Sequence, residues 1–313
     1  MRPLLFAVLL APTAFAGPVT VTFLHGNDFH AHLEPTLIRK KPYGGYARIA
    51  TVVKETRAKE RNVVLLSAGD TFQGTLYFNV YEGLADLAIM NAIGFQAMTL
   101  GNHEFDRGPK PLAAFAANAR FPLLSANLDA ASDPDLKGRI APSTVIAVGR
   151  EKIGVVGCTT PDTPNISSPG ETVRFLELVS TVQRAVDDLT AKGIDKVVLL
   201  SHIGYEEDRA LVGKLRNVDL VIGGHSHTPL GTPKIDGWPD ARGPYPTLVR
   251  DGAGIETPVV QAWEWGKTLG KIRVRFDGRG RVAKIEEARP IVIDETIPED
   301  PTVAGLVAAF RMP

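Results

Sequence analysis

Short runs of apolar, largely β-branched residues alternate along this chain with longer amphipathic stretches. The runs that we expect to form strands are Val19 to Leu24, Val63 to Ser67, Ala97 to Leu100, Ile153 to Cys158, Val197 to Leu200 and Leu220 to Ile222. Between several of them, apolar residues recur at helical spacing, as in Ile49 to Lys59 and Leu84 to Met90. Strands that alternate with helices in this way predict an α/β fold built in layers.

The last third of the chain has a different pattern. Residues 229–246 are rich in proline and glycine, which predicts a long, solvent-exposed surface loop. The β-rich runs that follow are Thr247 to Arg250, Val259 to Trp263, Leu269 to Phe276 and Val282 to Glu287, with a hairpin turn at Asp277-Gly278. Apolar residues on one face of Pro298 to Phe310 predict a short final helix.

The balance of charges limits the class of partner. The 313 residues include 35 Lys and Arg and 35 Asp and Glu, so no net positive field attracts a nucleic-acid polymer or an anionic membrane. The 44% hydrophobic content is enough to bury the core of one large domain. A small anionic substrate would therefore have to be held by local charges.

Residues 1–16 have the features of a signal peptide. A positively charged start precedes a short apolar run, and Ala14-Phe15-Ala16 is typical of a cleavage site. The run is too short to span a bilayer and is followed by Pro12, so we predict an exported chain, periplasmic or extracellular, without a membrane span after cleavage. Cys158 is the only cysteine, which excludes an intrachain disulfide, and its apolar surroundings predict a buried structural thiol.

Five of the expected strands are followed by polar clusters. In chain order these are Asn27-Asp28-Phe29-His30, Gly69-Asp70, Gly101-Asn102-His103-Glu104, Ser201-His202 and Gly223-Gly224-His225-Ser226-His227. Open α/β sheets bind ligands beyond the carboxyl ends of their strands. The five clusters are therefore predicted to converge on one crevice.

Histidine occurs only in or directly beside these clusters, at positions 25, 30, 32, 103, 202, 225 and 227. Imidazole and carboxylate ligands without thiolate favour zinc, manganese or iron. A single Asp-x-His or Gly-Asp pair more often orders a turn, whereas Gly-Asn-His-Glu and Gly-His-Ser-His are specific, and together they predict a metal site. For His25 and His32, which lie off the expected ligand positions, we expect structural or supporting roles.

At these residues the sequence resembles the 5′-nucleotidase and UDP-sugar hydrolase family of the calcineurin-like metallophosphoesterase superfamily. Residues 95–106 match one family signature throughout, and residues 24–31 resemble the other, with Gly26 in place of the usual Thr or Ile. Further similar segments are Gly44-Gly45 with Arg48 and residues 69–74, 201–204 and 219–227. The resemblance covers nearly all of the chain after residue 16 and implies a layered α/β/β/α sandwich.

The resemblance also implies roles for individual residues. The implied metal ligands are Asp28, His30 and His227 for one divalent ion, Asn102, His202 and His225 for a second, and Asp70 as a bridge between both. His103, held by Asp106, would be the catalytic histidine and not a metal ligand. Asn102 and His103 would in addition contact the substrate.

These roles predict a two-metal hydrolase of phosphate esters, with a nucleotide or a similar small phosphate monoester as the substrate. A metal-bound hydroxide would attack phosphorus, and His103 with Asp106 would assist the leaving oxygen. The alternatives are a 2′,3′-cyclic nucleotide phosphodiesterase, a UDP-sugar pyrophosphohydrolase, a thiosulfohydrolase and an inactive exported metal-binding scaffold. The intact His103 and Asp106 argue against the scaffold, because a pure binding protein has no evident use for this pair.

The resemblance divides the chain into a signal peptide at residues 1–16, a catalytic domain at residues 17–297 and a C-terminal helix at residues 298–313. Family members with nucleotidase activity carry a further C-terminal domain that grips the base and the phosphate, and the helix resembles the linker to it. We therefore expect a stand-alone catalytic domain, a domain whose counterpart is a separate chain, or an interrupted gene.

Overall fold

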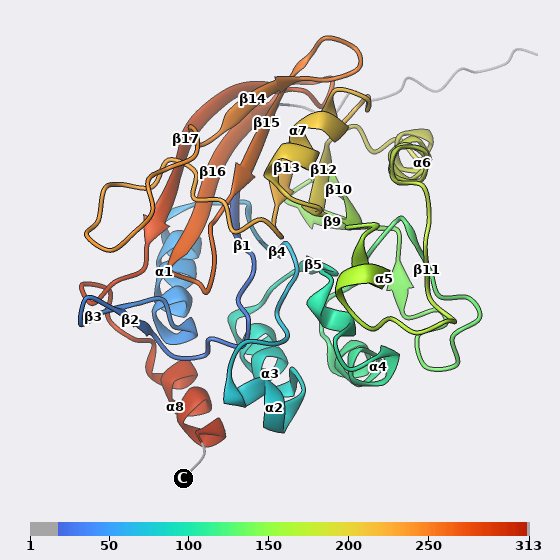
Figure 1. Ribbon diagram of the computed structural model, residues 1–313. Coiled ribbons are helices and arrows are strands. Elements are labelled where there is room, and N and C mark those ends of the chain that lie inside the picture. The colour runs from blue at the N-terminus through green and yellow to red at the C-terminus, as the bar shows by residue number, and fades with distance from the viewer. Residues whose placement is uncertain (1–17, 312–313) are drawn as a thin grey trace, which may run out of the picture.

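The computed structural model describes residues 18–311, so the predicted signal peptide lies outside the described residues. Two β-sheets pack face to face, and helices cover the outer face of each sheet (Figure 1). The predicted α/β/β/α sandwich is confirmed. Within residues 18–311, no helix has the length and apolar character needed to cross a membrane.

The first sheet has a parallel centre and an antiparallel extension. Its strands, in spatial order, are β17 (Val282–Val292), β16 (Thr268–Phe276), β1 (Val19–Gly26), β4 (Val63–Ser67), β5 (Ala97–Thr99), β6 (Leu123–Leu124) and β8 (Ile140–Ala141). From β1 to β8 every neighbouring pair is parallel, whereas β16 pairs antiparallel with both β1 and β17. The last two runs of the predicted β-rich ending, β16 and β17, therefore extend the first sheet, whereas the earlier two belong to the second.

The second sheet also has parallel strands at its centre. Its strands, in spatial order, are β14 (Thr247–Arg250), β15 (Glu256–Gln261), β13 (Leu220–Gly223), β12 (Val197–His202), β10 (Glu151–Thr159) and β9 (Ser143–Val148). The edge strands β14 and β9 are antiparallel to their neighbours. Two short pairs lie outside the main sheets: β2 (Thr36–Ile38) with β3 (Lys41–Tyr43), and β7 (Leu128–Asp129) with β11 (Arg174–Phe175).

Eight α-helices and one 3₁₀ turn complete the described residues. These are α1 (Tyr46–Lys59), α2 (Leu76–Tyr81), α3 (Leu84–Ile93), the 3₁₀ turn η1 (His103–Phe105), α4 (Pro109–Asn118), α5 (Thr163–Ile166), α6 (Leu178–Ala191), α7 (Tyr205–Val212) and α8 (Pro301–Phe310). The predicted C-terminal helix is confirmed as α8, which begins after Asp300, because this carboxylate accepts the N–H groups of Thr302 and Val303.

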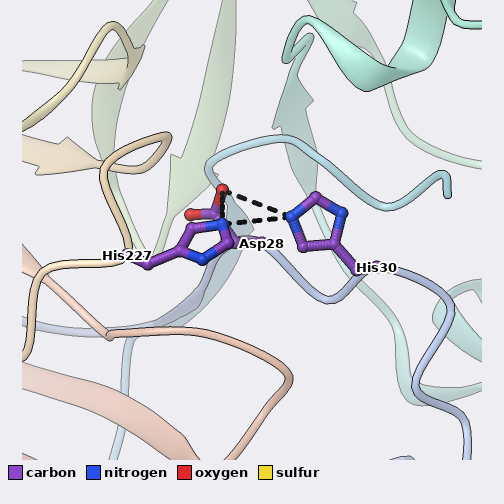
Figure 2. Close-up of side chains that lie close together, drawn as sticks. All are labelled: Asp28, His30 and His227. Carbon is purple, nitrogen blue, oxygen red and sulfur yellow. Dashed lines mark hydrogen bonds and ion pairs between the residues drawn. The ribbon is translucent and has the colours of Figure 1, made fainter. Parts of the chain in front are cut away.

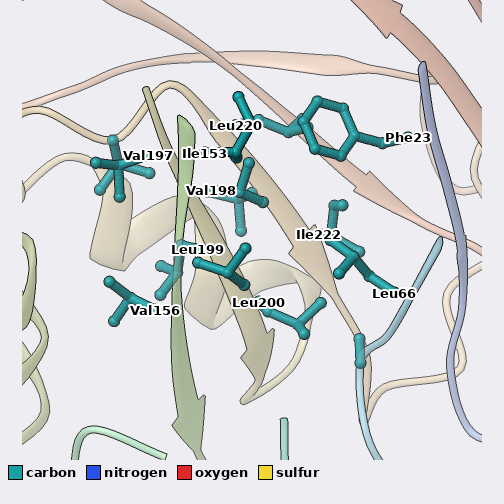
Figure 3. Close-up of a cluster of buried hydrophobic side chains, with 14 of the residues drawn as sticks. Phe23, Leu66, Ile153, Val156, Val197, Val198, Leu199, Leu200, Leu220 and Ile222 are labelled. Carbon is teal, nitrogen blue, oxygen red and sulfur yellow. The ribbon is translucent and has the colours of Figure 1, made fainter. Parts of the chain in front are cut away.

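Alternating residues of the first sheet enter two different cores. Val64 and Leu66 of β4 face the second sheet, where they join residues of β10, β12 and β13 (Figure 3), whereas Leu65 between them packs under the helices that include α1 and α3. The second sheet is covered on its outer side by α6 and α7 and is apolar on both faces. Burial on both faces explains why its strands are continuous apolar runs in the sequence. Cys158 is fully buried there, as predicted.

The prediction of a solvent-exposed loop at residues 229–246 is correct for its middle and wrong near both ends, where Leu230 and Tyr245 are buried. Tyr245 is only 9% exposed, and its hydroxyl lies 2.6 Å from Nε2 of His25, 220 residues earlier in the chain. Trp238 is half-buried, with its ring edge against Trp263 and Tyr43. Residues of this loop therefore anchor it to β1 and to the segment after β15. The structural role predicted for His25 is confirmed.

We expect His25 to make the fold sensitive to acid. Burial lowers the pKa of His25 from 6.5 to about 3, so below pH 6.5 the unfolded chain binds a proton at this ring and the folded chain does not. This ring alone should reduce the free energy of unfolding by about 2 kcal/mol between pH 7 and pH 5. In urea unfolding of the metal-free proteins, the free energy of unfolding of His25→Gln should fall by about 2 kcal/mol less than that of the parent chain between pH 7 and pH 5. Parallel pH profiles for the two proteins would contradict this account.

Candidate metal centre

The carboxyl ends of parallel strands from both sheets meet at one edge of the sandwich. Asp28 follows β1, Asp70 follows β4, Asn102 follows β5, His202 ends β12, and the Gly223 to His227 segment continues from β13. Three overlapping groups of side chains result: Asp28 with His30 and His227, His30 with Asp70 and His103, and Asp70 with His202 and His225. Within each group the ligand atoms lie within 4.8 Å of one another. The predicted convergence of the clusters is confirmed.

In the first group, three atoms point at a common centre (Figure 2). Nε2 of His227 lies 3.2 Å from Oδ1 of Asp28 and 3.1 Å from Nε2 of His30, and the His30 and Asp28 atoms are 3.9 Å apart. Oδ2 of Asp28 accepts a hydrogen bond from Nδ2 of Asn27 at 2.6 Å and from the backbone N–H of His225 at 3.0 Å. These donors fix the carboxylate and leave Oδ1 directed at the two rings.

The outer nitrogens of these rings determine their tautomers. Nδ1 of His30 lies 3.1 Å from the carbonyl oxygen of Phe72, and Nδ1 of His227 lies 2.5 Å from a carboxylate oxygen of Glu264. Both oxygens can only accept, so in the neutral rings the proton is on Nδ1 and the lone pair on Nε2. When both rings are neutral, two nitrogen lone pairs and the Asp28 carboxylate face one another, an arrangement that suits a cation between them.

The second group has the same arrangement. Nδ1 of His202 donates to the carbonyl oxygen of Ala68 at 2.6 Å, so Nε2 is the ring nitrogen that faces Oδ2 of Asp70 at 3.0 Å. Oδ1 of Asn102 is buried without a hydrogen-bond partner among the described residues. Buried acceptors without donors are uncommon in folded proteins. The donor set and this orphaned oxygen together fit a divalent metal ion.

Asp70 belongs to both neighbourhoods. Its Oδ2 is 3.0 Å from Nε2 of His202 and 3.9 Å from Nε2 of His30, while Oδ1 accepts the backbone N–H of His103 at 3.0 Å. Burial opposes the charge of Asp70, but the neighbouring His202 and His30 hold its pKa well below the usual range. Burial also opposes protonation of His202, yet Asp70 and Asp28 raise its pKa to about 9. A metal ion that binds here therefore displaces a proton.

The loops that carry these residues have an unusual backbone. Among the seven predicted metal ligands, those with positive φ are Asp28, His30, Asp70, His225 and His227, with values between 48° and 77°. Non-glycine residues seldom adopt this conformation, and its cost is tolerated mainly at functional sites. Gly101 is required for a related reason, because a Cβ there would lie 2.0 Å from Oδ1 of Asp70.

Glu104 holds two of these loops together, a role that the sequence reasoning missed. Its carboxylate is buried and accepts backbone N–H groups from Gly101, Asp70, Thr71 and Phe72 at 2.6 to 3.2 Å. This one side chain thereby joins the loop after β4 to the loop after β5. Its position in the Gly-Asn-His-Glu motif was the available signal. Asn27 and Glu264, which orient Asp28 and His227, were also missed.

His103 is paired with Asp106, as predicted. Its Nδ1 lies 2.6 Å from Oδ2 of Asp106, whose other oxygen accepts a hydrogen bond from Ser167 at 2.8 Å. Burial lowers the pKa of His103, but the Asp106 hydrogen bond and the charge of Asp70 outweigh this effect and raise it. The ring packs edge-on against His30. His103 can therefore hold a proton beside the cluster.

Two open pockets flank the cluster. One of about 660 Å³ is lined by residues that include Gln73, Asn79 and Asp106, and one of about 480 Å³ is lined by residues that include Tyr205, His227 and Arg242. His32, in contrast, stacks on Trp265 with ring centroids 4.4 Å apart and belongs to none of the three groups. The structural or supporting role expected for His32 stays a prediction.

Comparisons with known proteins agree with this geometry. The chain is 44% identical to a 5′-nucleotidase from Diplobatis ommata over 304 residues, which are 95% of this chain and 52% of that protein. It is 39% identical to the human 5′-nucleotidase over 307 residues, which are 95% of this chain and 53% of that protein. The chain thus spans about half the length of these relatives.

Solved structures give the same result. The chain superposes on a 5′-nucleotidase precursor from Thermus thermophilus with a TM-score of 0.91 and 46% identity, covering 93% of this chain and 58% of that one. For the NAD nucleotidase of Haemophilus influenzae the TM-score is 0.87 and the identity 28%, covering 94% and 60%. The family described as calcineurin-like phosphoesterase matches residues 21–229. Because this match spans more than half of the sequence, the chain belongs to the calcineurin-like phosphoesterase family.

Proposed function

We propose that this chain hydrolyses phosphate monoesters of nucleotides with two divalent metal ions. The observation that carries the proposal is the convergence of imidazole and carboxylate ligand atoms on two adjacent centres, with Asp70 close to His30 of one and to His202 of the other. A single ion would use only one of the two sets of ligand atoms. The similarity to 5′-nucleotidases supports the choice of substrate.

The proposed ligands follow the two groups. They are Asp28, His30 and His227 for the first ion, Asn102, His202 and His225 for the second, and Asp70 for both. Nitrogen and oxygen donors of this kind suit zinc, manganese or iron. Two ions held by these residues would supply an activated water molecule and positive charge for the phosphoryl oxygens.

The remaining roles belong to His103 and its neighbours. We assign to His103 the donation of a proton to the leaving oxygen, because Asp106 holds Nδ1 and leaves the other ring nitrogen free. Ser167 fixes Asp106 in turn. Asn102 and His103 would also contact the substrate. General acid catalysis by a positioned side chain typically contributes about 10² to 10⁴ in rate.

Cleavage of a pyrophosphate bond is a second candidate. The 28% identity to the NAD nucleotidase over 94% of this chain favours it. The likeness to the sulfate thiohydrolase of Thermus thermophilus, at 21% identity, concerns the fold alone. Both candidate reactions place phosphoryl oxygens on the same ligand set.

Turnover of a substrate panel by residues 17–313 tests the proposal. With manganese or zinc, we expect phosphate release from AMP to exceed cleavage of NAD, UDP-glucose and 2′,3′-cyclic AMP. Chelation should abolish turnover and lower the melting temperature, because the ligands come from separate loops and bind metal only when the chain is folded. Cleavage of NAD or UDP-glucose without AMP hydrolysis would favour the second candidate. No turnover of any ester by a protein with two bound ions would indicate a scaffold.

We also propose export and the predicted domain division, with a catalytic domain at residues 17–297 followed by the C-terminal helix. The word precursor in the name of the Thermus relative supports export. Val303 and Val307 of α8 pack into the same core as Ile49 and Val53 of α1, so the helix lies against the proposed catalytic domain.

A further inference from the structure

The segment that joins β15 to β16 runs beside the ligands proposed for the first metal ion. It has the sequence Trp263-Glu264-Trp265-Gly266-Lys267. One carboxylate oxygen of Glu264 lies 2.5 Å from Nδ1 of His227, and the other lies 2.5 Å from Nζ of Lys267. Both oxygens are therefore engaged, so Glu264 is held as a hydrogen-bond acceptor for His227 and is kept from turning toward the ion itself.

Lys267 is an unusual counter-charge for Glu264. Its side chain is only 2% exposed, and its Nζ lies 3.7 Å from the ring centroid of Trp263 and 4.3 Å from that of Trp265. Contacts of a cation with two indole faces replace part of the lost hydration. The ammonium group is fixed between the rings, which in turn fixes the carboxylate that holds His227.

The same segment also contacts the backbone of Asp28. The N–H of Trp265 donates to the carbonyl oxygen of Asp28 at 2.7 Å, and the carbonyl oxygen of Trp263 accepts from Nδ2 of Asn27 at 2.6 Å. Trp263 and Trp265 have φ values of 58° and 56°, so the chain adopts a left-handed backbone on both sides of Glu264. Such strain at aromatic residues indicates that surrounding contacts hold the segment in place.

We propose that Glu264, with Lys267 behind it, is a positioning residue for the first metal ion, an inference that rests on the proposed function. Glu264 keeps the proton of His227 on Nδ1, so the lone pair of Nε2 is available to the ion. The contacts of the segment reach His227 and Asp28 of the first ion. Glu264 therefore sets the affinity for the first ion and leaves the affinity for the second ion unchanged.

Metal titration of Glu264→Gln tests this assignment. An amide has one acceptor oxygen, and when that oxygen serves Lys267, the amide N–H faces Nδ1 of His227 and favours the tautomer that cannot bind metal. Competition with a chromophoric zinc chelator should show that one of two ions binds about 10- to 100-fold more weakly, with the other unchanged. Unfolding of the metal-free variant, measured in parallel, separates this effect from lost stability.

Glu60→Gln is the matched control. Glu60 makes a comparable ion pair with a mostly buried lysine of β16, at 2.6 Å from Nζ of Lys271, but belongs to none of the metal groups. We expect it to lower the stability of the metal-free chain and to leave both zinc affinities unchanged. An equal loss of zinc affinity in Glu60→Gln would overturn the assignment, because a general loss of stability would then explain both results.

A double-mutant cycle tests the mechanism. An amide ligand has no tautomer for Glu264 to select, so in a His227→Gln background the further change Glu264→Gln should alter the affinity of the first ion less than about twofold. Full additivity of the two changes would overturn the assignment. Unchanged zinc binding in Glu264→Gln beside a weakened first ion in His227→Gln would overturn it as well, and the proposed function would stand. Two ions bound at full affinity in His227→Gln would remove the ligand assignment and this inference together.

Discussion

Asp70→Ala should abolish nearly all activity of this chain and release metal from both positions. The carboxylate approaches His30 on one side and His202 on the other, and it also accepts the backbone N–H of His103. Metal ions contribute several kcal/mol of transition-state stabilisation, so we expect kcat/KM to fall by at least about 10³-fold. Asp28 also approaches the second group, with Oδ1 3.9 Å from Nε2 of His202, but Asp70 comes closer to that ring, at 3.0 Å.

Metal analysis and steady-state kinetics on the same preparation check this expectation. Metal content should fall from two ions per chain toward none, and Asp70→Asn should show an intermediate loss, because an amide oxygen retains one neutral donor. Asp133→Ala is the matched control. Asp133 is 2% exposed, and its carboxylate accepts hydrogen bonds from Asp135, Leu136 and Thr172 and belongs to none of the metal groups. Two ions at full occupancy in Asp70→Ala would refute the bridging role.

The site was largely predictable because its residues follow strand ends directly. Asp28, Asp70 and Asn102 each come within three residues of a parallel strand in one sheet, and His202 ends a strand in the other. Parallel strands bring their carboxyl ends to one edge, so local motifs are enough to predict a common crevice. The α/β/β/α sandwich was predicted only from the family resemblance. The alternation of strands and helices by itself predicts a layered fold but not the number of layers.

The residues that the sequence analysis missed act over long separations. Glu264 lies 37 residues after His227, and Tyr245 lies 220 residues after His25. Neither residue belongs to a motif or a periodic pattern. Tyr245 also lies in a proline-rich segment, and such segments are generally predicted to be exposed. Such contacts are set by tertiary packing, which a single sequence does not encode locally.

Some missed elements have simpler explanations. The strands β6, β7, β8 and β11 have two residues each, too few for any periodicity. In contrast, α6 could have been predicted, because Val182, Val186 and Leu189 recur at helical spacing and face the core. Glu104 was visible within its motif, but its four backbone contacts depend on the fold around Asp70.

His103→Ala should lower turnover by about 10² to 10⁴ while leaving metal content near two ions per chain. The residue is assigned to the leaving group, and its Nδ1 is already engaged by Asp106. Metal analysis separates this outcome from that of Asp70→Ala. Loss of an ion would reassign His103 as a ligand, an interpretation that its distance from His30 and Asp70 also permits.

The size of the loss should depend on the leaving group, which provides a control within the same variant. Nitrophenolate departs without a proton, so His103→Ala should hydrolyse nitrophenyl phosphate almost as well as the parent chain while losing most of its activity on AMP. Asp106→Asn should follow the same pattern with a smaller loss, because the ring remains but its orientation and protonated form lose their support. If His103→Ala lost the same fraction of its activity on both substrates, His103 would act by stabilising charge on the phosphoryl group and not as an acid.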